Sequence, residues 1–488
     1  MKINKTFITL FVIFIIIYFS LGLSHPFFMD ESIYSSLTKH FFTSSYQDFI
    51  KEMASTLGHP PLNILINSFF VYIFGFSEFS LRILTMLSAL LLFPISYFLA
   101  REFSLSPKIS SYLAFALSLI YPIFMVSHFS LSDTPALLFS CLSMLFFMKS
   151  IKNPRLMPLA TLFAVIGFFF KQYAIFPCIL LPYFFYRNKL KLNIYFILSG
   201  LFLITSIGGW MLFSYFTFSN AMSSYISIGF SPLLFLKKLG WIFFFSGFVI
   251  LPFSFFLIKK IPLNRLYLLL LLPLSYISYD FLVSTVSKTG YSIHGRIPLF
   301  YHVLPHTIYL AFAFLCFLAF LLFLANISLK KEEDKILLVL LFSTIVLLSI
   351  PTSGRTGLSV VEERHIIYLI PMLLILCFKK IKINFLFFIS LLALSLFSIL
   401  WLFTLIASSQ TAYDAAIYTN SLNSSFYAEP ALIYANTSLL ANITEAKYII
   451  SGEGFAGYDL IKNCQEVKVF NSKLFGLNIG SRKICEVK

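Results

Sequence analysis

Long apolar runs separated by short polar segments make up most of the chain from residue 6 to residue 406. A helix needs roughly 20 apolar residues to cross the hydrocarbon core of a bilayer, which is about 30 Å thick. The pattern therefore predicts thirteen transmembrane helices. Their approximate ranges are 6–24, 78–100, 109–127, 134–150, 156–170, 174–187, 193–216, 239–258, 265–283, 306–326, 335–351, 366–378 and 384–406.

The pattern changes after residue 406, where polar residues become frequent and apolar runs become short. Apolar and polar positions alternate on both sides of a glycine-rich segment, Gly452 to Gly457, which is typical of strands joined by turns. We therefore expect an all-α polytopic membrane domain over 1–406 and a small soluble α/β or β-rich domain over 407–488. Cys464 and Cys485 lie in this tail, where an oxidising exterior would permit a disulfide between them.

The composition excludes an ordinary soluble protein. Hydrophobic residues make up 59% of the chain and charged residues 11%, whereas soluble domains carry about 25% charged residues. The net charge of +16 could suggest a nucleic-acid partner, but the basic residues form short clusters between apolar runs. These clusters fall on alternate connections, and the positive-inside rule then places the N-terminus in the cytoplasm and the tail outside. We expect a multi-pass protein of the cell membrane that binds no nucleic acid.

Residues suited to chemistry gather in the segments assigned to the outer side. Asp30 and Glu31 follow the first span directly, at the start of a long outer loop over 25–77. His59 precedes two prolines and an apolar stretch over 62–77. This stretch is short for a span, so it predicts an interfacial helix.

Other residues of this kind lie in later outer connections. Asp133 belongs to a tight turn, Ser-Leu-Ser-Asp-Thr-Pro, where a cap for the following helix is an equally valid interpretation. Lys171 interrupts apolar sequence between two spans, and a lysine so near hydrocarbon either extends to water or meets an anion. Arg364 lies in Glu-Glu-Arg-His before the twelfth span, and Arg296 lies in another outer loop.

These motifs occur in a fixed order along the chain. Asp-Glu follows the first span, and His-Pro-Pro and Ser-Asp-Thr-Pro come next. The lysine between two spans follows, and Glu-Arg-His precedes a late span. This series resembles the GT-C superfamily of membrane glycosyltransferases, in the branch of protein O-mannosyltransferases and the bacterial lipid A aminoarabinose transferase. The resemblance covers residues 1 to about 380. It implies transfer of a sugar from a polyprenyl (dolichyl-type) phosphate donor to a protein, lipid or glycan acceptor at the outer face, with inversion.

The resemblance also implies roles for single residues. Asp30 would be the general base, since a neutral hydroxyl needs a carboxylate to take its proton. The catalytic set would be Asp30, Glu31 and Asp133. Cations at a low-dielectric boundary stabilise the departing phosphate, and here these would be Lys171, Arg364 and His59. The remaining substrate contacts would be Tyr34, Tyr173, Glu363, His365 and Arg296.

Two departures from the aminoarabinose branch favour a mannosyl or other hexosyl donor. Ser32 and Ile33 follow the Asp-Glu pair where that branch has a basic residue, and His59 precedes two prolines instead of one. The mechanism requires no cofactor, although Asp30 and Asp133 are also candidate ligands of a divalent cation. The alternative function is a transporter or flippase, but such proteins usually bind their substrate near the middle of the membrane.

Overall fold

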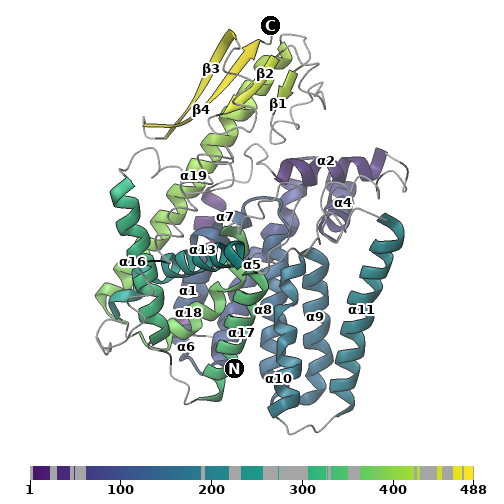
Figure 1. Cartoon of the computed structure of the whole chain (residues 1–488), viewed down its shortest axis with the longest axis vertical. Coiled ribbons are helices and arrows are strands. Elements are labelled where there is room, and N and C mark those ends of the chain that lie inside the picture. Colours follow the sequence, from purple (N-terminus) through teal and green to yellow (C-terminus); the bar gives the residue numbers. More distant parts are fainter. Residues whose placement is uncertain are drawn as a thin grey trace.

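The computed structural model describes residues 4–21, 30–43, 45, 49, 62–187, 193–218, 232–256, 273, 306–325, 327, 331–349, 363–381, 383–421, 426–428, 448–452, 465–474 and 477–486. The described residues up to 421 are mostly helical, and a small sheet lies beyond one end of the helical bundle (Figure 1). The α-helices are α1 (Lys5–Ser20), α2 (Asp30–Thr43), α4 (Leu62–Phe74), α5 (Glu78–Glu102), α6 (Pro107–Leu119), α7 (Tyr121–Ser127), α8 (Asp133–Ser150), α9 (Met157–Phe170), α10 (Leu180–Arg187), α11 (Ile194–Phe218), α13 (Pro232–Ile250), α16 (His306–Ala325), α17 (Glu332–Ser349), α18 (Ile370–Phe378) and α19 (Phe385–Ser421). Short 3₁₀ helices are η1 (Pro154–Leu156), η2 (Gln172–Ile179), η3 (Leu251–Phe256) and η5 (Glu363–Tyr368).

A helix lies at each predicted span except 265–283, which falls almost wholly outside the described residues. Among the described residues, α5 and part of α11 are long and apolar enough to cross a membrane. The bent pair α6 and α7 would be a third span, and several shorter apolar helices accompany them. The count of thirteen spans therefore stays a prediction.

The predicted span 109–127 is not one straight helix. It bends by 62° between α6 and α7. Pro122 occupies the first turn of α7. It has no backbone N–H, so it cannot continue the hydrogen bonding of α6. The bend sets the direction of α7 and hence of the short connection that leads into α8.

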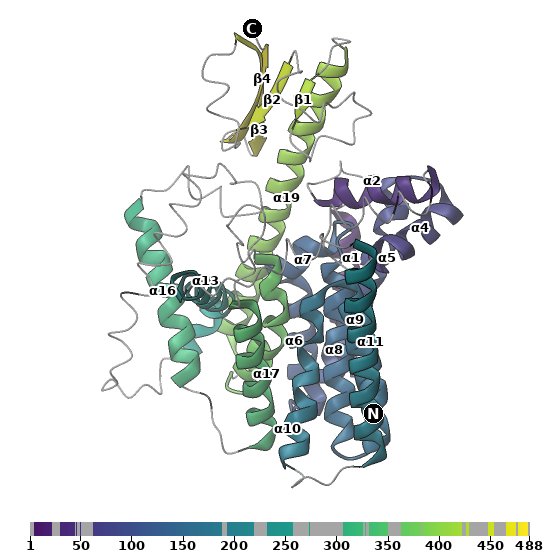
Figure 2. The ribbon, with the colours of Figure 1, turned by 45° about the vertical axis from the view of Figure 1, so that its right-hand side comes forward.

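Helices α5, α8, α9 and α11 run side by side, and α2 and α4 lie across one end of this group (Figures 1 and 2). The start of α5 is well defined, because Ser77 and Ser80 form a capping box in which the Ser77 hydroxyl accepts from the Ser80 amide at 3.1 Å. The cap places Arg82 in the second turn of α5, close to α2 and α4.

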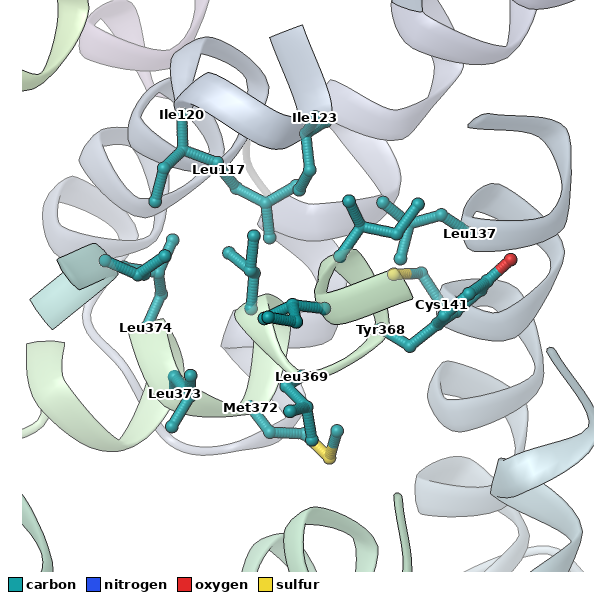
Figure 3. Packing of buried hydrophobic residues seen from close by; sticks show 14 of the residues in the cluster. Leu117, Ile120, Ile123, Leu137, Cys141, Tyr368, Leu369, Met372, Leu373 and Leu374 are labelled. Carbon is teal, nitrogen blue, oxygen red and sulfur yellow. The ribbon is translucent and has the colours of Figure 1, made fainter. Parts of the chain in front are cut away.

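A late part of the chain packs against an early part. Figure 3 shows η5 and α18 meeting α6, α7 and α8 through buried apolar side chains. The labelled residues are Leu117, Ile120, Ile123, Leu137, Cys141, Tyr368, Leu369, Met372, Leu373 and Leu374. This packing brings the start of η5 close to the connection between α7 and α8.

The C-terminal sheet has four strands in the order β1-β2-β4-β3. They are β1 (Phe426–Ala428), β2 (Tyr448–Gly452), β3 (Gln465–Leu474) and β4 (Leu477–Glu486), and only β1 and β2 are parallel. Helix α19 runs through the predicted boundary at 406/407 to contact β3 and β4. Its 37 residues span about 55 Å, so one continuous helix joins the bundle to the sheet.

The predicted disulfide stays a prediction. Cys485 lies in β4, where its backbone is opposite Ile449 on one side and Glu466 on the other. Cys464 lies immediately before β3, outside the described residues.

Candidate functional site

A buried ion pair joins α2 to α5. The Arg82 guanidinium donates from Nε to Glu31 Oε1 at 2.7 Å and from Nη2 to Glu31 Oε2 at 2.8 Å. The side chains are 1% and 0% exposed. Two parallel hydrogen bonds match the flat faces of guanidinium and carboxylate, which fixes the direction of both groups. The ion pair therefore holds the first turn of α2 against the start of α5.

The connection between α7 and α8 completes the surroundings of Glu31. The Ser130 amide donates to Glu31 Oε1 at 2.7 Å, and the Ser130 hydroxyl donates to the Leu81 carbonyl at 2.7 Å. Asn67 of α4 donates from Nδ2 to the same hydroxyl at 3.0 Å. One serine thus joins α2, α4 and α5, and the Glu31 carboxylate accepts three N–H bonds.

Tyrosines hold both ends of the same connection. Tyr34 of α2 places its hydroxyl 3.2 Å from the Ser132 hydroxyl, and Tyr18 of α1 donates to the Ser127 carbonyl. Between them, His128 Nδ1 lies 2.8 Å from the Phe124 carbonyl. Tyr34 was predicted as a substrate contact, and the structure places it directly on the Ser-Leu-Ser-Asp turn.

A second buried ion pair lies at the other side of this turn. Lys171 Nζ donates to Asp133 Oδ1 at 2.5 Å, with side chains 2% and 1% exposed. Asp133 is the first residue of α8, and Lys171 ends α9 in an extended conformation. The two buried charges are stable only as a pair, because either charge alone would be shielded from water without a counter-charge.

A glycine allows Lys171 to reach Asp133. The Lys171 amide donates a hydrogen bond to the Gly167 carbonyl at 2.9 Å. A Cβ at Gly167 would lie 3.1 Å from the Cβ of Ala174 and 3.4 Å from that of Phe139. A methyl group at this position would require α9, α8 or η2 to shift by a few tenths of an ångström. The Ser140 hydroxyl strengthens it by donating to the Ala174 carbonyl at 3.0 Å.

The other predicted site residues fall into two groups. Asp30 is the first residue of α2, next to Glu31, and Tyr173 lies half-buried in η2 beside Lys171. Glu363, Arg364 and His365 form the start of η5, which packs against α7 and α8. The side chains of Asp30 and of these three η5 residues are not among those described. His59 and Arg296 lie outside the described residues altogether.

Sequence reasoning missed the partner of Glu31. Arg82 is a lone cation near the start of a 25-residue apolar helix, and an ionisable residue in such a helix marks a functional site by default. That signal could have identified Arg82. Ser130 and Asn67 carried no comparable signal, because serine and asparagine are common at helix ends and in connections.

Asp30 and Asp133 are also candidate ligands of a divalent cation. Asp133 lies against the Lys171 ammonium, and the side chain of the other candidate ligand, Asp30, is not among those described. Within the described residues no group of three or more His, Cys, Asp or Glu side chains could hold a metal ion. A requirement for a divalent cation therefore stays an alternative.

Residues 58–227 match the family described as dolichyl-phosphate-mannose-protein mannosyltransferase. The matched segment contains Arg82, Ser130, Asp133 and Lys171. It therefore includes the whole Asp133–Lys171 pair and Arg82 of the other pair, whereas Glu31 precedes the segment. No curated protein matches the sequence.

Two solved structures share the fold of the whole chain. One is ArnT from Cupriavidus metallidurans bound to undecaprenyl phosphate, with a TM-score of 0.52 at 12% identity over 98% of each chain. The other is the same protein in the apo state, with a TM-score of 0.53 at 12% identity and the same coverage. At this identity the match shows the fold. The resemblance to GT-C membrane glycosyltransferases that the sequence predicted is confirmed by the family match and the shared fold together.

Proposed function

We propose that this chain transfers a sugar, of the mannosyl or another hexosyl type, from a polyprenyl-phosphate donor to a protein, lipid or glycan acceptor at the outer face of the cell membrane. The observation that carries the proposal is the pair of buried salt bridges, Glu31–Arg82 and Asp133–Lys171, on either side of one turn. The family match and the shared fold support the class of reaction, and the undecaprenyl phosphate in the ArnT structure supports the class of donor.

Asp30 is the residue that we assign as general base. Glu31 accepts three N–H bonds, so its carboxylate is engaged and serves to hold α2 in place. Asp30 precedes it as the first residue of α2, where the positive end of the helix favours a negative charge. A carboxylate in this position can take the proton of the acceptor hydroxyl as the new bond to the anomeric carbon forms.

Lys171 is the cation that we assign to the donor phosphate, together with Arg364 and His59. Asp133 holds the Lys171 ammonium in place, and an ammonium group carries three N–H donors. Negative charge grows on the phosphate as the glycosidic bond breaks, and a cation fixed beforehand at a dry site stabilises that charge. In this mechanism Asp133 positions Lys171, while Tyr34, Tyr173, Glu363, His365 and Arg296 remain proposed contacts of the sugar or the acceptor.

The test is turnover of a labelled donor by purified protein in lipid nanodiscs. With polyprenyl-phosphate mannose or polyprenyl-phosphate glucose as donor and a cell-envelope extract as source of acceptor, a transferase moves the sugar to an acceptor hydroxyl and releases polyprenyl phosphate. Asp30→Asn should lower the rate at least about 100-fold, the usual contribution of a general base, and keep donor binding. Asp414→Asn is the matched control, because Asp414 is exposed on α19.

Each alternative has its own outcome. Unchanged turnover in Asp30→Asn would contradict the assignment of Asp30 as the general base. Movement of donor between leaflets without release of polyprenyl phosphate would favour the flippase. Loss of turnover in a chelator, restored by a divalent cation, would favour the metal-dependent mechanism.

A further inference from the structure

The polar and apolar faces of helix α4 are reversed relative to those of a surface helix in a soluble protein. Its buried face carries Asn63 and Asn67, each 1% exposed, whereas Phe69 and Tyr72 on the outer face are 58% and 80% exposed. Apolar side chains outside and amides inside are expected where the outer surroundings are lipid. If α4 is the interfacial helix that the sequence predicts, it separates lipid from a polar interior.

The amide of Asn63 has no hydrogen-bond partner within the part of the chain that the structure describes. Both Nδ2 and Oδ1 are buried and unpaired, and Asn63 is the only described residue for which this holds at two side-chain atoms. Asn67 uses Nδ2 to donate to Ser130, but its Oδ1 is also buried and unpaired. Leaving buried polar atoms unpaired is unfavourable, so three of them on one helix face require an explanation.

These amides lie beside the candidate site. Asn63 and Asn67 are four residues apart on α4, so their Cβ atoms are about 6 Å apart on one face. The Ser130 hydroxyl accepts from Asn67, and the Ser130 amide donates to Glu31, the residue after Asp30. The unpaired amide atoms therefore lie next to the turn that holds Glu31, one residue from the proposed base.

We infer that Asn63 and Asn67 bind hydroxyl groups of the donor's sugar, an inference that rests on the proposed function. A carboxamide offers N–H donors and a carbonyl acceptor, and a sugar hydroxyl both donates and accepts, so the two groups pair completely. A phosphate, which only accepts, would instead meet the cations. The donor arrives from lipid, where the apolar outer face of α4 can contact its prenyl chain while the sugar reaches the inner face.

The decisive variant is Asn63→Leu, which keeps the size of the side chain and removes both unpaired atoms. We expect the KM for polyprenyl-phosphate mannose, or for the glucose donor if that one is used, to rise about tenfold through the loss of one to two hydrogen bonds. The melting temperature in nanodiscs should stay the same or rise, because nothing in the free protein pairs with this amide. A structural asparagine would give the reverse, with a lower melting temperature and an unchanged KM.

The matched control is Tyr97→Phe. The Tyr97 hydroxyl is also buried and unpaired, but it lies deeper in α5, where the ring packs against Phe7. Its removal should leave the KM for the donor unchanged. A tenfold rise in the control as well would overturn the inference, since it would show a general effect of changing the packing.

Donors that lack single hydroxyls of the sugar extend the test. With the monodeoxy donor that lacks the contacted hydroxyl, wild type and Asn63→Leu should have the same KM. If every monodeoxy donor still shows the tenfold difference, the inference is wrong. Asn63→Ser gives an intermediate KM if Asn63→Leu fails to fold. An inactive wild type would refute the proposed function itself, whereas an active wild type with an unaffected Asn63→Leu refutes only this inference.

Discussion

Two polar clusters lie at the two ends of α5. The site cluster, made of Glu31, Arg82 and Ser130 with the Asp133–Lys171 pair, includes the second turn of this helix. Beyond its last turn the Ser104 hydroxyl donates to Glu333 at 2.8 Å, and Lys379 pairs with Glu333 and Asp334. We call this second group the α17 cluster. The 20 helical steps from Arg82 to Glu102 rise about 30 Å, close to the thickness of the hydrocarbon core.

The clusters differ in their access to water. The charged side chains of the site cluster are at most 2% exposed, whereas Lys379 and Glu333 are 14% and 32% exposed. Water and salt weaken a partly exposed ion pair, so it contributes little to stability. A fully buried ion pair rarely stabilises a protein more than apolar residues of the same size would. The presence of such a pair therefore favours a functional role. The comparison thus favours the buried cluster as the proposed site, whereas the α17 cluster joins helices.

Arg82→Met should have the largest effect. It leaves the Glu31 carboxylate buried without its counter-charge, which costs about 3–5 kcal/mol, and it releases the turn of α2 that carries Asp30. We expect a large drop in the melting temperature together with loss of turnover, measured in nanodiscs.

The double variant Arg82→Met with Glu31→Gln separates the two effects. It removes both charges, so most of the stability should return while the position of Asp30 stays altered. Recovery of full turnover in this double variant would contradict a positioning role for the ion pair.

Gly167→Ala should have a smaller effect. The new methyl group would lie 3.1 Å from the Cβ of Ala174, so α9 or η2 must shift by a few tenths of an ångström. We expect a loss of about 1–3 kcal/mol from overpacking, and a higher KM for the donor because Lys171 moves with the end of α9.

Gly209→Ala is the control for that variant. Gly209 lies in α11 with nothing near its would-be Cβ, and alanine is the better helix former. Its stability should stay the same or rise by up to about 1 kcal/mol. Equal losses at the two glycines would show that the close approach of α8, α9 and η2 does not matter.

Lys379→Met should have the smallest effect of the series. The lysine is only partly buried, and its loss should cost about 0–1 kcal/mol without changing turnover. A loss as large as that of Arg82→Met would erase the difference between the two clusters. The melting temperature and the rate of polyprenyl-phosphate release are the two measurements.

Much of the fold follows from local pattern. Apolar runs between basic clusters predicted where the helices lie, because a helix that faces lipid needs only its own residues to be apolar. The 62° bend between α6 and α7 was not predicted, although Pro122 was visible as its cause. The continuation of α19 to Ser421 was also missed, since a helix beyond the lipid boundary can be polar.

The sequence by itself identified candidate site residues, namely acidic and basic residues that interrupt or border apolar runs, although Arg82 was missed among them. Tertiary structure alone decided how they pair. Glu31 meets Arg82 across 51 residues and Asp133 meets Lys171 across 38, through the packing of α2 and α5 on α4 and of α9 on α8. Periodicity reports the environment of each helix separately, whereas a salt bridge depends on the distance and direction between two helices. That geometry arises only when residues distant in the sequence, such as Gly167 of α9 and Phe139 of α8, pack together, so no local pattern contains it.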